Sequence, residues 1–453
     1  MSTPRFTTGS LFGHITVMTF TSAIGLMGVF LVDLADMFFL SLLGEVELAS
    51  AIGYAGSILF FTTSISIGLA ITMSALVSRA TGAGRDDLAE QQANAVFVFA
   101  LGVTIPASIV VWWFVPELLS LIGAKGRALE LGTTYLRIVV PFMSLLMLGM
   151  AAGGVLRALG QANMAMWITL AGAGVNLVLD PILIFGFDMG VAGAATASAV
   201  ARIAMGAIGL WMVFGRMGYC FRPSLKHLAA NFRLIIGIAA PAMVTNTATP
   251  IGNAFVTATI ATFGDGAVAG YAIVSRIMPV AFGVVYSLSG AVGPIIGQNF
   301  GAERFDRVKK TVREAVAFAA GFIMLVALAL FALQDALIAL FSVTGDAAAM
   351  IAFFCTFTAV VFVFDGAQFV ANATFNNLNR AAWSTIANWG KATLGTIPFV
   401  WLGAYYYGAK GALAGQAAGA ALSGIIAISV AFWLTNRLQR AGVSTPVRTS
   451  APT

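Results

Sequence analysis

The stretch Thr81-Gly82-Ala83-Gly84-Arg85-Asp86-Asp87 recurs 219 residues later as Phe300-Gly301-Ala302-Glu303-Arg304-Phe305-Asp306. Two further segments repeat at about the same offset, since residues 156–160 match 375–379 and residues 190–194 match 408–412. Short patterns of Gly and Ala recur wherever helices pack closely, so one match alone carries little weight. Three matches at one offset, each at a corresponding helix boundary, indicate an internal duplication.

The composition indicates which solvent surrounds the duplicated unit. Of the 453 residues, 59% are hydrophobic and 9% are charged, whereas soluble proteins have about 25% charged residues. So few charges cannot cover a water-soluble globule of this length, and we expect most of the surface to face lipid. The net charge of +6 comes from dispersed basic residues, a distribution that argues against nucleic-acid binding.

Twelve segments are apolar enough and long enough to cross a bilayer, which takes about 20 residues per helix. They are residues 11–40, 48–78, 92–115, 131–156, 164–186, 190–214, 232–262, 267–297, 314–341, 348–375, 383–406 and 409–437. The predicted fold class is an all-α integral membrane protein with twelve transmembrane helices in two six-helix lobes related by pseudo-twofold symmetry. Because six is an even number, both lobes enter the membrane from the same face, as parallel repeats.

The charges on the loops predict the orientation in the membrane. The predicted parts are an amino-terminal lobe, a linker, a carboxy-terminal lobe and a disordered tail, at residues 1–215, 216–233, 234–440 and 441–453. Seventeen Lys and Arg residues lie in the two termini and in the loops after even-numbered helices, whereas the other loops contain Lys125, Arg127 and Lys410. Basic residues concentrate in cytoplasmic loops, so both termini and the linker are predicted to be cytoplasmic.

A carboxylate and an amide in the fifth predicted helix form a candidate cation site. An ionisable side chain at membrane depth costs roughly 2.5–3.5 kcal/mol to insert, so each one is a candidate functional residue. In Asn176-Leu177-Val178-Leu179-Asp180-Pro181 the spacing of four places Asn176 and Asp180 on one helix face, where both offer oxygens to one ion. The alternative is a hydrogen bond that only ties this helix to a neighbour.

A second pair of acids, Asp33 and Asp36, lies three residues apart in the first predicted helix. Two neighbouring carboxylates cannot both ionise cheaply, which suits a site that alternately holds a proton or a cation. For Asp33 the equal alternative is a structural ion pair with a base within the membrane, either Arg202 or Arg137.

The chain resembles the multidrug and toxin extrusion (MATE) family over nearly its whole length. The segment from Asp36 to Gly44 is similar to the family's first-helix pattern, and Asn176-xxx-Asp180-Pro181 is similar to its fifth-helix cation motif. Gly190-xx-Gly193-Ala194-Ala195-x-Ala197-Ser198 is similar to the sixth-helix signature. The family usually has Thr where this chain has Ser198, so the neighbouring Thr196 is an alternative hydroxyl ligand.

The resemblance implies a V-shaped pair of lobes that exports amphipathic, often cationic small molecules, with H+ or Na+ as the coupling ion. It implies no cofactor, no metal other than Na+, a monomer, and a bacterial cytoplasmic (inner) membrane location. The coupling site would consist of Asp36, Asn176, Asp180 and Ser198. The sequence contains no phosphate-binding loop and no motif for a catalytic nucleophile, so an enzyme is not expected.

In the carboxy-terminal half, Asp365 resembles the tenth-helix acid of one branch of this family. That branch also has a Glu in the seventh helix, which this chain lacks. Asp365 is therefore left with Asn246 or Thr245 as a neutral partner, or with Lys391 in a structural ion pair.

A second function class is a flippase for lipid or polyisoprenoid-linked substrates with the same superfamily architecture. Such a flippase needs a strongly cationic central cleft, to which only Arg137, Arg202, Arg276 and Lys391 can contribute.

The predicted orientation is testable with an epitope tag placed after Thr453. Because of the charge bias, we expect antibody to label this tag only after the cells are permeabilised. A tag inserted beside Lys125 serves as the control and should be labelled on intact cells. Labelling of the terminal tag on intact cells would contradict the topology.

Overall fold

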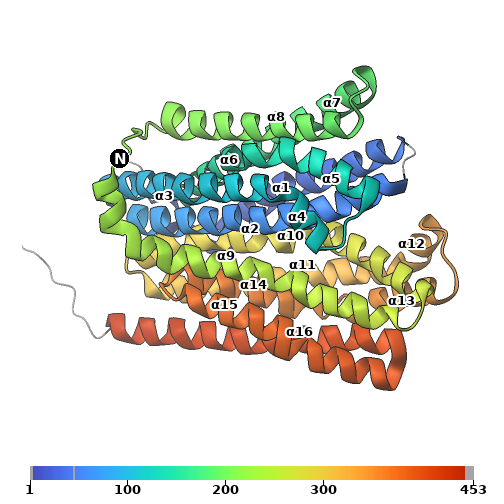
Figure 1. Ribbon diagram of the computed structural model, residues 1–453. Coiled ribbons are helices and arrows are strands. Elements are labelled where there is room, and N and C mark those ends of the chain that lie inside the picture. The colour runs from blue at the N-terminus through green and yellow to red at the C-terminus, as the bar shows by residue number, and fades with distance from the viewer. Residues whose placement is uncertain (1–3, 44–45, 444–453) are drawn as a thin grey trace, which may run out of the picture.

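The protein is a bundle of long helices that run roughly along one direction (Figure 1). A computed structural model describes residues 4–43 and 46–443. The amino half contains α1 Leu11–Ser41, α2 Val46–Gly82, α3 Asp86–Trp113, α4 Val115–Leu121, α5 Gly126–Val139, α6 Met143–Ala158, α7 Ala162–Pro181 and α8 Gly190–Leu210. The carboxy half contains α9 Leu225–Ala261, α10 Asp265–Gly301, α11 Phe305–Ala332, α12 Gln334–Leu340, α13 Gly345–Phe353, α14 Phe362–Asn377, α15 Ala381–Gly390 and α16 Ile397–Val443.

The outer surface of the bundle is apolar. Large side chains such as Leu325, Ile386 and Leu394 are 68%, 70% and 77% exposed. Exposed apolar area on this scale is stable only against lipid, so these helices span a membrane. Among the described residues, ten helices are long and apolar enough to cross, and the bent pair formed by residues 345–358 and 362–377 gives an eleventh.

The last apolar stretch, Ala381–Ala441, crosses twice because it folds back on itself within α16. Tyr407 and Gly408 have non-helical dihedral angles, and Gly408 adopts φ = 63°. The arm before the fold includes α15 and the π-helical segment Lys391–Gly395. It packs so closely against the arm after the fold that a Cβ on Gly419 would lie 1.5 Å from the carbonyl oxygen of Gly395. Counting both arms makes the number of crossings consistent with the twelve predicted spans. The start of α1 and the end of α16 lie at the same end of the bundle (Figure 1).

Several helix boundaries differ from those expected. The helix predicted at 131–156 is divided by a 3-10 turn at Val140–Phe142, where Pro141 has no N–H to continue the α-helical hydrogen bonding. The helix predicted at 348–375 contains a π-helical segment, Phe354–Thr358, and bends by 62° after it. α9 already begins at Leu225, inside the predicted linker, because the Ser224 hydroxyl caps it by accepting from the N–H of His227. The predicted tail lies outside the described residues from 444 onward.

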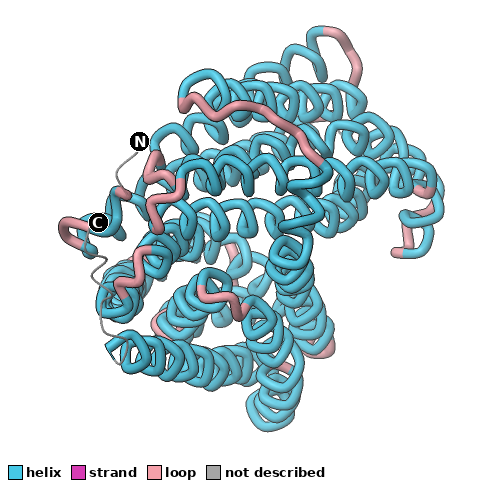
Figure 2. The backbone as a smooth tube through the Cα atoms, turned by 90° about the vertical axis from the view of Figure 1, so that its left-hand side faces the viewer, coloured by secondary structure: helices cyan, strands magenta, loops and turns pink. Residues whose placement is uncertain are grey.

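The two halves meet along a few long helices. α1 packs along α10, and α2 packs along both α9 and α10. Within the amino half, α7 packs against α1 and α8, which brings together the three helices that contain the predicted coupling residues. Figure 2 views the bundle from one end, along the general direction of the helices.

The close packing of the two arms on either side of Gly408 predicts that Gly419→Ala destabilises the protein. The added methyl group would overlap the Gly395 carbonyl, and overpacking of this kind costs about 1–3 kcal/mol. Gly321→Ala is the matched control, because nothing lies within 4 Å of a Cβ at that helical glycine. The thermal unfolding midpoint in detergent should fall for the first variant and not for the second. Equal midpoints would contradict the hairpin packing.

Candidate functional site

The candidate site lies in the amino half, where α1, α7 and α8 meet. Asp36 is near the end of α1, Asn176 and Asp180 are on α7, and Ser198 is on α8. Asn176 bridges the two acids: its Nδ2 donates to Asp36 Oδ1 over 3.4 Å and to Asp180 Oδ2 over 2.9 Å. The predicted spacing of four residues therefore does place the amide beside the carboxylate.

Burial makes the Asp180 carboxylate unusual. Asp180 has no exposed surface and Asn176 is only 7% exposed. Asp180 Oδ1 is buried without any hydrogen-bond partner, and the Asp36 carboxyl is its direct neighbour. A buried carboxylate oxygen without a partner is costly, and two adjacent carboxylates repel if both are ionised. A proton or a cation between Asp36 and Asp180 would remove both costs.

The oxygens at this site suit a hard cation. Carboxylate and amide oxygens are the ligands that hard cations prefer, and Asp36 and Asp180 offer neighbouring carboxylates. The Asn176 amide presents its nitrogen to both acids, so its oxygen becomes a ligand only when the amide turns over. A single proton shared by the two acids satisfies the same electrostatics. The geometry therefore accommodates either of the two coupling ions considered from the sequence.

Tyr135 was not among the residues singled out from the sequence. Its hydroxyl lies 3.4 Å from Ser198 Oγ, and so α5 contributes to the site next to α8. Thr196, the alternative hydroxyl ligand, instead donates to the carbonyl of Ala192 in its own helix over 2.7 Å. A signal for Tyr135 was present, because a hydroxyl-bearing aromatic residue in an apolar span needs a polar partner.

Asp33 does not form either of the ion pairs considered for it. Arg202 donates to the carbonyl oxygen of Val139 over 3.2 Å, and Arg137 lies over the ring of Trp112 at 5.8 Å. Among the described residues no base lies within salt-bridge distance of Asp33, whose side chain is exposed. Its spacing places it one turn from Asp36, at the edge of the site.

In the carboxy half, Asp365 on α14 accepts a hydrogen bond from the ammonium group of Lys391, and the two form an ion pair. The side chains of Asp365 and Lys391 are 13% and 29% exposed. The neutral partners considered from the sequence lie elsewhere: Thr245 bonds to Thr385, and Asn246 donates to the carbonyl of Ala242.

This ion pair continues into a stripe of polar contacts between α14 and α15. Asn388 donates to Asn372 Oδ1 over 2.9 Å, and Ser384 donates to Asn376 Oδ1 over 3.1 Å. Asp365, Asn372 and Asn376 are spaced so that all three lie on one face of α14. The corresponding face in the amino half lacks such a row among the described residues, so the two halves differ in chemistry despite their shared fold.

The ion pair predicts a non-additive pattern of stability. Asp365→Asn strands the Lys391 ammonium and Lys391→Met strands the carboxylate, so each single variant should lower the unfolding midpoint in detergent. The double variant removes both charges and should recover most of the loss. Losses that simply add in the double variant would contradict a structural role for the pair.

Comparison with known proteins agrees with this architecture. A profile described as MatE matches the chain twice, at residues 22–182 and 241–402, once in each half. A FAD transporter of Shewanella oneidensis is 28% identical over 87% of this chain and 89% of its own length. The multidrug export protein MepA of Staphylococcus aureus is 23% identical over 89% of each chain.

A solved structure shares the arrangement of the helices. The crystal structure of a mutant of VcmN, a MATE transporter of Vibrio cholerae, superposes with a TM-score of 0.87 at 25% identity, over 96% of this chain and 98% of its own. The same family profile matches both halves of the present chain. The protein therefore belongs to the MATE family, and it is a multi-pass membrane transporter and not an enzyme.

Proposed function

We propose that the protein is an antiporter that exports amphipathic organic compounds in exchange for H+ or Na+. The observation that carries this proposal is the fully buried Asp180, whose Oδ1 has no hydrogen-bond partner and whose carboxyl group neighbours that of Asp36. A group that must be neutralised in one state and can be hydrated in another is suited to ion coupling. The lobes at 1–215 and 234–440 would move as bodies around the linker, with both termini in the cytoplasm, in an inner membrane and as a monomer.

Coupling of ion binding to export then follows from the difference between the affinities of two conformations for the same ion. A cation that binds Asp36 and Asp180 more tightly in one conformation shifts the population toward that conformation. Asn176 donates to both carboxylates, so binding of an ion changes the packing of α1 against α7. Movement of these helices would lower the affinity for the exported compound on the far side of the membrane.

Two substrate classes are consistent with the relatives. MepA is named as a multidrug export protein, which supports amphipathic drugs as the first candidate. The FAD transporter has the higher identity of the two and supports flavin dinucleotide as a second candidate. Purified protein in vesicles can be offered both compounds in parallel.

The structure offers little support for the flippase alternative. Of the four bases that could form a cationic cleft, Arg202 bonds to a backbone carbonyl, Arg137 stacks on Trp112 and Lys391 pairs with Asp365. This leaves Arg276 as the one member of that set without a partner among the described residues. A single free guanidinium is a weak receptor for a pyrophosphate group.

The proposal predicts that Asp180→Asn abolishes gradient-driven export. The amide keeps the shape of the side chain but cannot exchange a proton or neutralise a cation. Efflux of a fluorescent cationic dye from proteoliposomes would be measured with a proton gradient, with a sodium gradient and with neither. We expect at least a tenfold lower rate, on the scale of a lost ionic interaction.

Asp335→Asn is the matched control, because it makes the same chemical change at an exposed position on α12. This variant should transport like the parent protein. Parental efflux by Asp180→Asn at equal reconstituted amounts would overturn the coupling site. Equal efflux with and without gradients in the parent protein would overturn coupling altogether.

A further inference from the structure

α2 and α10 cross at one end of the bundle through two symmetry-related patterns of small residues. Ser78 and Gly82 on α2 lie 219 residues before Gly297 and Gly301 on α10, which is the offset of the sequence repeat. A Cβ on Gly82 would lie 2.0 Å from the carbonyl oxygen of Gln298, and one on Gly301 would lie 2.0 Å from that of Arg79. Small residues spaced by four allow this backbone approach. The two halves are thus in direct contact here.

Arg79, beside this crossing, reaches from the amino half to the end of α14 in the carboxy half. Its Nε donates to the carbonyl oxygen of Asn377 over 2.8 Å, and its Nη2 donates to that of Asn376 over 2.6 Å. Its Nη1 donates to the side chain of Asn379. The carbonyl groups of Asn376 and Asn377 lie at the C-terminal end of α14. The last carbonyl groups of a helix have no N–H donor within the helix, and the negative end of the helix dipole there favours a cation.

Gln298 makes the corresponding contact in the opposite direction. Its Nε2 donates to the carbonyl oxygen of Ala158, at the end of α6 in the amino half, over 2.8 Å. Residues 79 and 298 differ by 219, and so do residues 158 and 377. One hydrogen bond between the halves is therefore present twice, related by the pseudo-twofold axis. Gln298 has no exposed surface.

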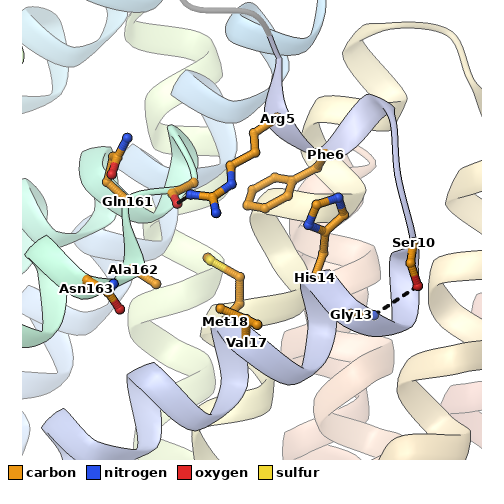
Figure 3. A pocket seen from close by; sticks show the side chains of 11 residues that line it. Arg5, Phe6, Ser10, Gly13, His14, Val17, Met18, Gln161, Ala162 and Asn163 are labelled. Atoms are coloured by element: carbon orange, nitrogen blue, oxygen red, sulfur yellow. Dashed lines mark hydrogen bonds between the residues drawn. The ribbon is translucent and has the colours of Figure 1, made fainter.

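The segment before α1 crosses the same junction. The Phe6 N–H donates to Gln298 Oε1 over 2.9 Å. The Phe6 carbonyl oxygen accepts hydrogen bonds from the side chains of Asn299 and Arg307 in the carboxy half. On the other side, Arg5 donates to the carbonyl oxygen of Gly160 over 2.8 Å. Figure 3 shows Arg5 extending toward the segment that precedes α7, above a cavity of about 320 Å³, with Phe6 facing His14.

We propose that Arg79 and Gln298 form a pseudo-symmetric latch that holds the halves together at this end, secured by the segment Arg5–Gly9. The inference rests on the proposed antiport, because an exporter must part its halves at this end to admit substrate. Parting removes the partners of both latch residues, and water must replace them. Arg79 makes three bonds across the junction and Gln298 donates one. Arg79 therefore contributes more to closure.

The test measures a distance and needs no substrate or ion. Spin labels would be attached at Asp87→Cys and Asp306→Cys, an exposed pair that is itself related by the offset of 219. The labelled protein is full length in lipid nanodiscs, with Cys220→Ser to remove the exposed native thiol. Pulsed electron spin resonance then gives the distribution of distances between the halves in the parent and in each latch variant.

The parent protein should show mainly the short distance of the closed end. Arg79→Gln should raise the ratio of long to short distances about tenfold, as expected when charge-assisted hydrogen bonds are lost, and Gln298→Ala should raise it less. Arg85→Gln is the control, since it removes an exposed basic residue near the same end and should leave the distribution unchanged.

Unchanged distributions in both latch variants, or a parent already dominated by the long distance, would overturn the latch. If Arg79→Gln does not yield monodisperse protein, Gln298→Ala and Arg79→Lys carry the same test. Dye efflux is measured separately on each variant. Lost efflux with a parental distance distribution would assign Arg79 to transport and not to closure, whereas failure of coupling at Asp180 leaves the distance experiment unaffected.

Discussion

No water is available inside a hydrocarbon layer to bond with a backbone N–H or C=O group, so each segment that crosses must satisfy its own backbone. This constraint explains why the described residues are nearly all helical and why the breaks occur where they do. The 3-10 turn at Pro141 and the π-helical segments Phe354–Thr358 and Lys391–Gly395 interrupt long helices within the protein. At these points neighbouring helices and local turns replace the regular hydrogen bonds.

The same constraint applies to side chains and makes each buried polar group informative. Many of them have a partner: Arg202 has a backbone carbonyl, and Gln298 has partners on both sides. Two described acids have a buried carboxylate oxygen without a hydrogen bond, Asp180 and Glu314. Glu314 pairs with Lys310, whereas Asp180 has another acid beside it and no base within salt-bridge distance in the part of the chain that the structure describes. This difference distinguishes a site for an exchangeable ion from a structural contact.

Duplication gave both halves one fold, while their polar residues have diverged. The amino half concentrates acids at Asp36 and Asp180, and no described base forms a salt bridge with either of them. The carboxy half balances Asp365 with Lys391 and continues into a neutral stripe toward Ser384. Symmetry persists most clearly where the halves touch, at the crossing of α2 and α10, because each side there must fit the backbone of the other. Polar residues in the interior of each lobe do not contact the other half, so they could diverge without disturbing this fit.

The sequence by itself determined the membrane class, the approximate position of the spans and the pairing of Asn176 with Asp180. These features depend on apolar length and on the helical period, both of which are local. The observed helix ends differ from the predicted ones by up to several residues, as at Leu225. Capping residues and π-helical turns set where a helix ends, and neither changes the hydrophobicity from which the spans were predicted. The repeat also located the boundary at Gly82 and Gly301, although nothing in the pattern indicated that these glycines touch the opposite half.

Contacts between helices were decided only by the tertiary structure. Tyr135 reaches Ser198, Lys391 rather than Asn246 faces Asp365, and Arg79 reaches the end of α14. Each of these depends on how one helix is rotated and tilted against another, which results from packing across the whole bundle. Sequence spacing specifies which residues share a face of one helix, but it does not specify which other helix that face meets.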